Sequence, residues 1–242
     1  MFLAKMKDSN CTNSNTFKLE ADLVTILIDK IDNLVKNTTA VFKKQEWYIG
    51  RRIADIAICG FNSTPLPNSL PKSIKRLNYY DIHIIAHLFN RPLRLLTVSE
   101  RVKSSASKVQ ESLDKLKRCE LVAQTNAGAY HLTDWRCFVP SEIITIEAKL
   151  QDWKTAIQQA SYHKKFSDFS YIAMPSKKCT NENLTDSCKE LGIGLISVFN
   201  KSKFTLSIKA KRNCASNSPQ RDIAAMSLLQ AFMKEASHAT AV

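Results

Sequence analysis

Apolar residues in the first part of the chain recur at helical spacing and then alternate with polar ones. The helical set predicts a helix from Phe17 to Lys36 and comprises Leu19, Leu23, Ile26, Leu27, Ile31, Leu34 and Val35. Two strands, 41–49 and 51–60, follow with Gly50 at the turn between them, which predicts a β-hairpin. Residues 1–16 are rich in Asn, Ser and Thr, and we expect them to form a flexible N-terminal tail.

A proline-rich stretch then interrupts the pattern. The segment FNSTPLPNSLPKS has three prolines within residues 65–71, and we interpret 62–77 as a linker. Residues 78–135 form a separate block in which three amphipathic helices precede two short strands around Asn126–Gly128. Three helices followed by a small hairpin resemble a winged helix-turn-helix domain, inserted here into a larger fold.

The alternation of strands and helices resumes near Ser141. It predicts the strand EIITIEAKL, a helix capped by Asp152, the strand FSYIAMP, a helix closed by Gly192, two more strands and a final helix over 219–236. Without residues 62–140, the order of elements is α β β β α β α β β α. This order predicts an α/β fold with one mixed central sheet flanked by helices, formed by the discontinuous segments 17–61 and 141–242.

Charged residues stand within one of these predicted strands and at the end of another. Asp55 lies in RRIADIAI, and Glu147 and Lys149 lie in IEAKL, where their spacing of two places both side chains on one face of a strand. A Q-x-x-x-Y pair, Gln158 and Tyr162, follows on one face of the next helix. This D…E-x-K order resembles the PD-(D/E)xK, or restriction-endonuclease-like, nuclease superfamily and its RecB-type subgroup, although Ala54 replaces the name-giving proline.

The resemblance implies a restriction-endonuclease-like core and a catalytic site. Asp55, Glu147 and the carbonyl of Ala148 would bind Mg²⁺ (or Mn²⁺), which prefers oxygen ligands and lowers the pKa of a bound water. Lys149 would orient the attacking water or stabilise negative charge, and its pKa could be lowered by partial desolvation. The further catalytic residues implied are Glu20, Gln158 and Tyr162.

Each of these residues also has a structural interpretation. Asp55 can pair with Arg51 or Arg52, and Glu147 with Lys149 can be a solvated pair on an edge strand. Asp22 and Asp29 compete with Glu20 for the role of the additional acid, and an acid near a helix N-terminus is common for electrostatic reasons.

The charge of the chain favours a polyanionic partner. The net charge is +13, and residues 72–118 hold eleven Lys or Arg against four acids. Small hydroxyl residues and lysines near the start of the third predicted helix suit contacts with phosphates and bases. Alternatively, residues 78–135 serve dimerisation or pack on the core. The DNA-binding candidates are Lys103, Ser105, Ser107, Lys108, Gln110 and Lys115.

A second basic run accompanies the last predicted hairpin, where it either lines a DNA channel or solvates an edge strand. It comprises Lys201, Lys203, Lys209, Lys211 and Arg212. No stretch is apolar enough for a membrane span, the start lacks the apolar core of a signal peptide, and the seven cysteines form no C-x-x-C. These features predict a cytoplasmic protein with reduced thiols and no membrane contact.

The sequence therefore predicts an Mg²⁺-dependent DNA endonuclease that hydrolyses phosphodiester bonds, aided by a winged-helix DNA-binding domain. Cutting of both strands would favour a homodimer. The alternatives are a catalytically inactive, regulatory DNA-binding protein on a nuclease-like scaffold, and a nuclease subunit that acts with a protein partner in a defence or mobile-element system. The sequence leaves open the choice of DNA or RNA and of single or double strands.

Overall fold

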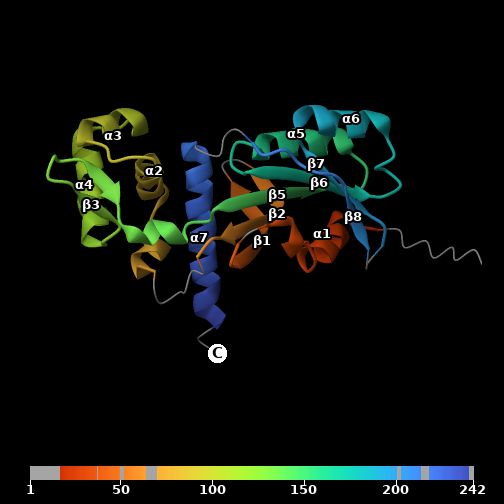
Figure 1. Ribbon diagram of the computed structural model, residues 1–242, viewed down its shortest axis with the longest axis horizontal. Coiled ribbons are helices and arrows are strands. Elements are labelled where there is room, and N and C mark those ends of the chain that lie inside the picture. Colours follow the sequence, from red (N-terminus) through yellow and green to blue (C-terminus); the bar gives the residue numbers. More distant parts are fainter. Residues whose placement is uncertain are drawn as a thin grey trace, which may run out of the picture.

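A six-stranded mixed sheet forms the centre of the computed structural model, which describes residues 17–36, 38–49, 52–63, 70–200, 203–213 and 218–239 (Figure 1). The predicted N-terminal tail and Gly50 lie outside these residues. The strand order is β1-β2-β5-β6-β7-β8, and only the pairs β5–β6 and β6–β7 are parallel. The strands are β1 (Ala40–Ile49), β2 (Arg52–Phe61), β5 (Glu142–Ala148), β6 (Phe169–Pro175), β7 (Gly194–Val198) and β8 (Phe204–Ile208).

Helices cover both faces of this sheet, which confirms the predicted α/β class. Helix α1 (Glu20–Ile28) packs Leu23 and Leu27 against the isoleucines of β2 and β5. On the opposite face, α5 (Trp153–His163) and α6 (Glu182–Leu191) bury a second apolar cluster with β6 and β7 (Figure 1). The order of elements agrees with the prediction once the block after β2 is removed.

The first predicted helix is shorter than its apolar pattern. Helix α1 ends at Ile28, and a 3-10 turn, η1 (Ile31–Leu34), follows it. Ile31 remains fully buried, so the apolar spacing continues although the chain has changed direction. The two caps proposed at the other helices are confirmed, because Asp152 accepts the N–H of Thr155 at 3.1 Å and Gly192 ends α6 with φ of +67°.

The block between β2 and β5 contains helices and a small hairpin in the predicted order. Its helices are α2 (Tyr79–Leu88), α3 (Leu95–Val102) and α4 (Ala106–Arg118), its strands are β3 (Val122–Gln124) and β4 (Tyr130–Leu132), and its 3-10 turns are η2 (Lys72–Arg76) and η3 (Asp134–Phe138). Strands β3 and β4 pair antiparallel, and Leu93 forms an additional bridge to Tyr130.

The C-terminal helix α7 (Pro219–Ala239) joins this block to the sheet. It stands between the two parts in Figure 1, where it separates α2 from the hairpin β1–β2. Leu228 and Leu229 belong to one buried cluster that continues into α2, α4 and β2. Part of the predicted linker also packs here, because the side-chain amide of Gln230 donates to the carbonyl oxygens of Ile74 and Leu77. Within the described residues, no helix has the length and apolar character needed to cross a membrane.

Candidate active site

Asp55 and Glu147 lie side by side on the central strands β2 and β5. The antiparallel pairing of these strands ends at Ile56 and Ile146. Asp55 directly precedes Ile56 on β2, and Glu147 directly follows Ile146 on β5. A carboxylate oxygen of Asp55 accepts the backbone N–H of Ala148 at 2.7 Å, which fixes the acid against the end of β5. The fold thus brings together two residues that are 92 positions apart in the sequence.

Lys149 connects this pair to helix α1. Its ammonium lies 3.1 Å from Oε1 of Glu147 and 2.9 Å from Oε2 of Glu20. The Lys149 side chain is 15% exposed, Glu147 is 1% exposed and Glu20 is 45% exposed. The three charges therefore run from the sheet interior towards solvent, with the cation in the middle.

Helix α1 can deliver only one of the three competing acids to Lys149. Asp22 accepts the N–H groups of Lys18 and Leu19, so its carboxylate closes the N-terminus of the helix. Asp29 lies at the opposite end of α1, at its C-cap. Glu20, the first residue of the helix, is the acid that contacts Lys149.

The structure contradicts one structural alternative for these residues and half of another. Glu147 is buried on β5, which has a neighbour on each side, so it is not a solvated residue of an edge strand. Arg52 stacks over the ring of Tyr162, with its guanidinium carbon 5.5 Å from the ring centre, and it forms no ion pair with Asp55. Arg51 lies outside the described residues.

Burial and mutual repulsion shift the pKa values of the acids. The pKa of Glu147 is raised to about 7, chiefly by burial and then by the charge of Asp55, against the lowering effect of Lys149. The pKa of Asp55 is also raised, chiefly by burial, against the lowering effect of the Ala148 N–H. Because two like charges share one partly desolvated site, the pair favours either a proton or a cation.

The pKa of Lys149 does not shift in the expected direction. Burial alone would lower it, but the hydrogen bonds to Glu20 and Glu147, together with the negative charges of Glu147 and Asp55, outweigh burial and raise the pKa. The ammonium therefore stays protonated at neutral pH. A role for Lys149 as a cation and hydrogen-bond donor follows from this shift more directly than a role as a base.

The Q-x-x-x-Y pair lies on α5 but forms no hydrogen bond with Lys149 within the described residues. Gln158 is exposed, and Tyr162 is half-buried between the cations of Arg52 and Lys165, at 5.5 Å and 5.4 Å from its ring centre. The contacts of Gln158 and Tyr162 with a phosphate therefore remain predictions.

The DNA-binding candidates of the inserted block divide into exposed and engaged residues. Lys103, Ser105 and Ser107 are exposed at the start of α4. The amide of Gln110 bonds to Asp114 and to the hydroxyl of Tyr130, so both of its polar atoms are in use.

Two of the lysines in this set also have partners within the block. The ammonium of Lys115 pairs with Asp81, a buried acid that also accepts the hydroxyl hydrogen of Ser112. Lys108 lies 4.7 Å from the ring centre of Tyr80. These contacts hold α4 against α2, a structural role that sequence analysis did not predict for Lys115.

A second buried charge cluster was missed by sequence analysis. Asp168 is 1% exposed, accepts the N–H of Ile143 at 2.8 Å and pairs with Arg221 of α7 at 2.9 Å. Asp222 lies beside this pair, and burial raises its pKa to about 7. No local signal marks these residues, because Asp168 and Arg221 are 53 positions apart.

Comparison with known proteins adds little to this geometry. No protein-family model matches the chain, and no curated protein matches it. Among solved structures, the chain is similar to wild-type ZitR of Lactococcus lactis with 18% identity over 47% of this chain, at a TM-score of 0.24. The match spans 64% of the ZitR chain. A likeness at this TM-score carries no argument about fold or function.

Proposed function

We propose that this protein is a metal-dependent endonuclease of the PD-(D/E)xK type, with a restriction-endonuclease-like core and an inserted winged-helix domain. The observation that carries the proposal is the meeting of Asp55, Glu147, Lys149 and Glu20 where the pairing of β2 with β5 ends. These are the four charged residues that the sequence resemblance assigns to catalysis, and they come from three separate elements.

The residues present suit a magnesium ion. Oε2 of Glu147 is buried and receives no hydrogen bond from the described part of the chain, so an oxygen ligand with no partner points into the site. Asp55, Glu147 and the carbonyl of Ala148 would hold Mg²⁺ or Mn²⁺, both of which prefer oxygen. Among the described residues, no group of three or more His, Cys, Asp or Glu side chains is arranged as a metal site. The proposed ligand set therefore relies on two carboxylates and a backbone carbonyl.

The bound ion would supply Lewis-acid chemistry, acidifying a water and neutralising phosphate charge. The chain itself supplies a protonated lysine next to that position. Lys149 is held from one side by Glu20 and from the other by Glu147, so its ammonium is positioned before a substrate arrives. A positioned cation stabilises the negative charge that grows on the phosphoryl oxygens during cleavage.

The inserted block supports a nucleic-acid partner for this site. Three helices followed by a hairpin are the elements of a winged helix, and α4 is the helix that would face DNA. Lys103, Ser105 and Ser107 are exposed at its start, and the hydroxyls of the two serines lie 3.4 Å apart in a hydrogen bond with each other. We propose that this end of α4 contacts the phosphate backbone.

The experiment that tests the proposed activity is a cleavage panel. Supercoiled, linear, single-stranded and branched DNA, together with RNA, are incubated with the protein in Mg²⁺, Mn²⁺ or EDTA. The proposal expects metal-dependent cleavage of at least one nucleic acid. Cleavage that persists in EDTA, or no cleavage of any substrate in either metal, would contradict it.

A second candidate function is favoured by the position of Lys149. Its ammonium lies between two carboxylates, Glu147 and Glu20, and so compensates part of the negative charge of the site without a metal. A nuclease-like scaffold with such an internal cation suits a regulatory protein that binds DNA without cutting it. This alternative expects salt-dependent DNA binding in the same panel with no turnover.

A further inference from the structure

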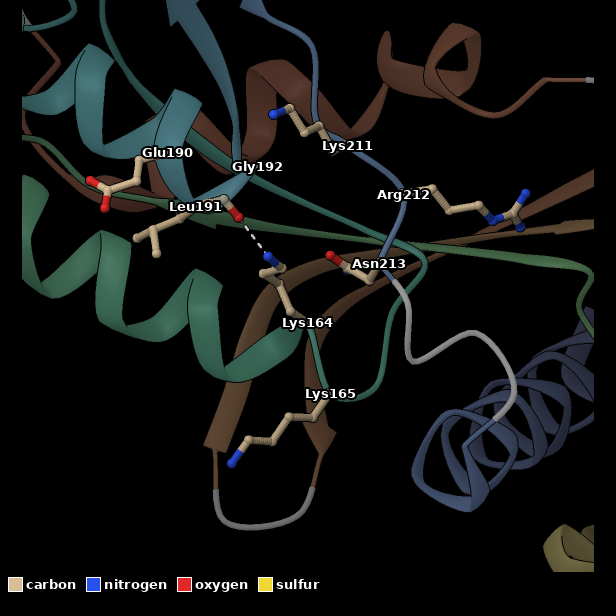
Figure 2. Close-up of a pocket in the computed structure, with 8 residues that line it drawn as sticks. All are labelled: Lys164, Lys165, Glu190, Leu191, Gly192, Lys211, Arg212 and Asn213. Carbon is tan, nitrogen blue, oxygen red and sulfur yellow. Dashed lines mark hydrogen bonds between the residues drawn. The ribbon is translucent and has the colours of Figure 1, made fainter.

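A basic hollow of about 380 Å³ lies at the C-terminal end of α5, and none of Asp55, Glu147, Lys149 and Glu20 lines it (Figure 2). The end of α6 and the segment after β8 complete its wall. Its lining contains one carboxylate, that of Glu190, and four cations: Lys164, Lys165, Lys211 and Arg212. We call this the basic hollow.

Three of the four cations have protein partners, and that of Lys165 is the ring of Tyr162, 5.4 Å from its ammonium. The ammonium of Lys164 donates to the carbonyl of Leu191 at the end of α6, as the dashed line in Figure 2 shows. Arg212 lies 3.5 Å from the buried Asp168. Lys165 and Lys211 are exposed and have no carboxylate within 4.0 Å among the described residues. The hollow therefore presents the ammonium of Lys211 to an external anion, and the ammonium of Lys165 extends from its edge towards the ring of Tyr162 (Figure 2).

A second hollow, of about 270 Å³, lies between the end of β1, helix α2 and helix α7. Its aromatic lining consists of Trp47, Tyr48, Tyr79 and Phe166. Tyr48 is 72% exposed and Tyr79 is 69% exposed, which is unusual for large rings beside a folded core. We call this the aromatic cleft.

The linings of the two hollows are adjacent in sequence just after α5. Lys164 and Lys165 line the basic hollow, and the next residue, Phe166, lines the aromatic cleft. The ring of Tyr162 lies 5.4 Å from that of Phe166 and is flanked by the cations of Lys165 and Arg52. Cations and rings thus follow one another from one hollow to the other.

We infer that the basic hollow and the aromatic cleft together bind single-stranded nucleic acid. An exposed strand offers phosphates to cations and base faces to aromatic rings, and proteins that bind single strands combine these two features. In a duplex the base faces are stacked on one another, so they would not be available to stack on the tyrosines of the cleft. The inference rests on the proposed function and deepens it by naming a single-stranded segment as the part of the substrate held beside the core.

The basic hollow also lies on elements separate from the proposed DNA-contacting end of α4, whereas the aromatic cleft is lined in part by α2 of the inserted block. The basic hollow is built by α5, α6 and the segment after β8, whereas Lys103 and Ser105 belong to the inserted block. A substrate with both a duplex and a single-stranded arm would engage the two surfaces together. Substitutions in one surface are therefore expected to weaken one kind of binding selectively.

Fluorescence anisotropy with a labelled 20-nucleotide strand and the matching blunt duplex tests this inference in EDTA, where metal-dependent cleavage is absent. The double variant Lys165→Gln/Lys211→Gln is expected to weaken binding of the single strand about 10-fold at 100 mM KCl and to reduce its salt slope by about 1.4. The double variant Tyr48→Ala/Tyr79→Ala is expected to weaken the same binding about 10-fold with an unchanged salt slope.

The matched control is Lys72→Gln/Lys234→Gln, which removes the same charge from two exposed lysines outside both hollows. It is expected to change binding of the single strand less than 3-fold, and all variants are expected to keep the wild-type melting temperature. The tyrosine variant is expected to leave duplex affinity within 2-fold of wild type.

Three results would overturn the inference. These are unchanged single-strand binding by either test variant, equal losses for strand and duplex in the tyrosine variant, and competition by polyglutamate as efficient as by unlabelled strand, which would indicate an acidic protein partner. Failure of this inference is distinguishable from failure of the proposed activity. Selective binding of the single strand without metal-dependent cleavage would contradict only the proposed activity. Metal-dependent cleavage without selective binding of the single strand would contradict only this inference.

Discussion

The ammonium of Lys149 lies 3.1 Å from a carboxylate oxygen of Glu147, a residue whose side chain is 1% exposed. The same ammonium lies 2.9 Å from Glu20, so one cation serves a buried acid and a half-exposed one. Because the second oxygen of Glu147 receives no hydrogen bond from the described residues, the buried carboxylate retains one ligand position. The candidate site thus combines a positioned cation with an unsatisfied anion, and the two are separable by mutation.

Substitution of the three central residues is expected to separate metal binding from catalysis. Asp55→Ala, Glu147→Ala and Lys149→Ala are each expected to lower the rate of cleavage at least about 100-fold, which corresponds to about 3 kcal/mol of transition-state stabilisation. Isothermal titration calorimetry with Mn²⁺ is expected to show weakened metal binding in Asp55→Ala and Glu147→Ala, because each loses a metal-ligating carboxylate. Lys149→Ala is expected to keep Mn²⁺ binding. Loss of Mn²⁺ binding in the Lys149→Ala variant would contradict the assigned roles.

The acid on α1 can be tested with two substitutions on the same helix. Glu20→Gln removes the outer partner of Lys149 and is expected to lower the cleavage rate about 10-fold with little change in stability, because exposed ion pairs contribute about 0–1 kcal/mol. Asp29→Asn makes the same chemical change at the other end of α1 and is expected to cleave at the wild-type rate. Equal cleavage rates in the Glu20→Gln and Asp29→Asn variants would contradict a catalytic role for Glu20.

Strand alternation explains why the core of the site was predictable from sequence. Glu147 and Lys149 are two residues apart on a strand, so they had to share a face, and a neighbouring strand of a hairpin could bring Asp55 to them. The same logic could not choose between Glu20, Asp22 and Asp29, which are all acids on one helix. That choice depends on which carboxylate caps the helix, as Asp22 does.

Long-range pairing explains what the sequence did not predict. The residues after the three prolines were interpreted as a linker, yet Ile74 is fully buried and its carbonyl accepts a hydrogen bond from Gln230, 156 positions away. The pairing of Asp168 with Arg221 likewise exists only after α7 has packed on the sheet. Periodicity describes the face of one element, and it carries no information about which distant element will cover that face.

Removal of the buried acid Asp168 is expected to destabilise the fold. Asp168→Asn leaves Arg221, whose side chain is 8% exposed, without its closest anionic partner, and loss of one member of a buried ion pair costs about 3–5 kcal/mol. Asp186→Asn, in an exposed pair with Lys189, is the matched control and is expected to cost under about 0.5 kcal/mol. Urea unfolding followed by circular dichroism measures both, and equal midpoints would contradict the role of Asp168.

The neighbouring acid Asp222 is expected to make stability depend on pH. Burial is the main cause that raises the pKa of Asp222 from 3.8 to about 7 in the folded protein, and Asp168 raises it further against the lowering effect of Arg221. Between these two values the folded state holds a proton that the unfolded state has lost. The free energy of unfolding therefore falls as pH rises from about 4 to about 7, and the contribution is lost above that window.

Asp222→Asn removes this dependence while keeping the size of the side chain. At pH 4.5 the variant and the wild type are expected to have similar stabilities, because Asp222 is then largely uncharged in the folded state. At pH 8 the variant is expected to be more stable by about 2–4 kcal/mol, since a shift of one pKa unit corresponds to about 1.4 kcal/mol. Urea unfolding across this range gives the difference between the two proteins, in which groups common to both cancel. A difference that stays constant from pH 4.5 to pH 8 would show that Asp222 ionises equally in the folded and unfolded states.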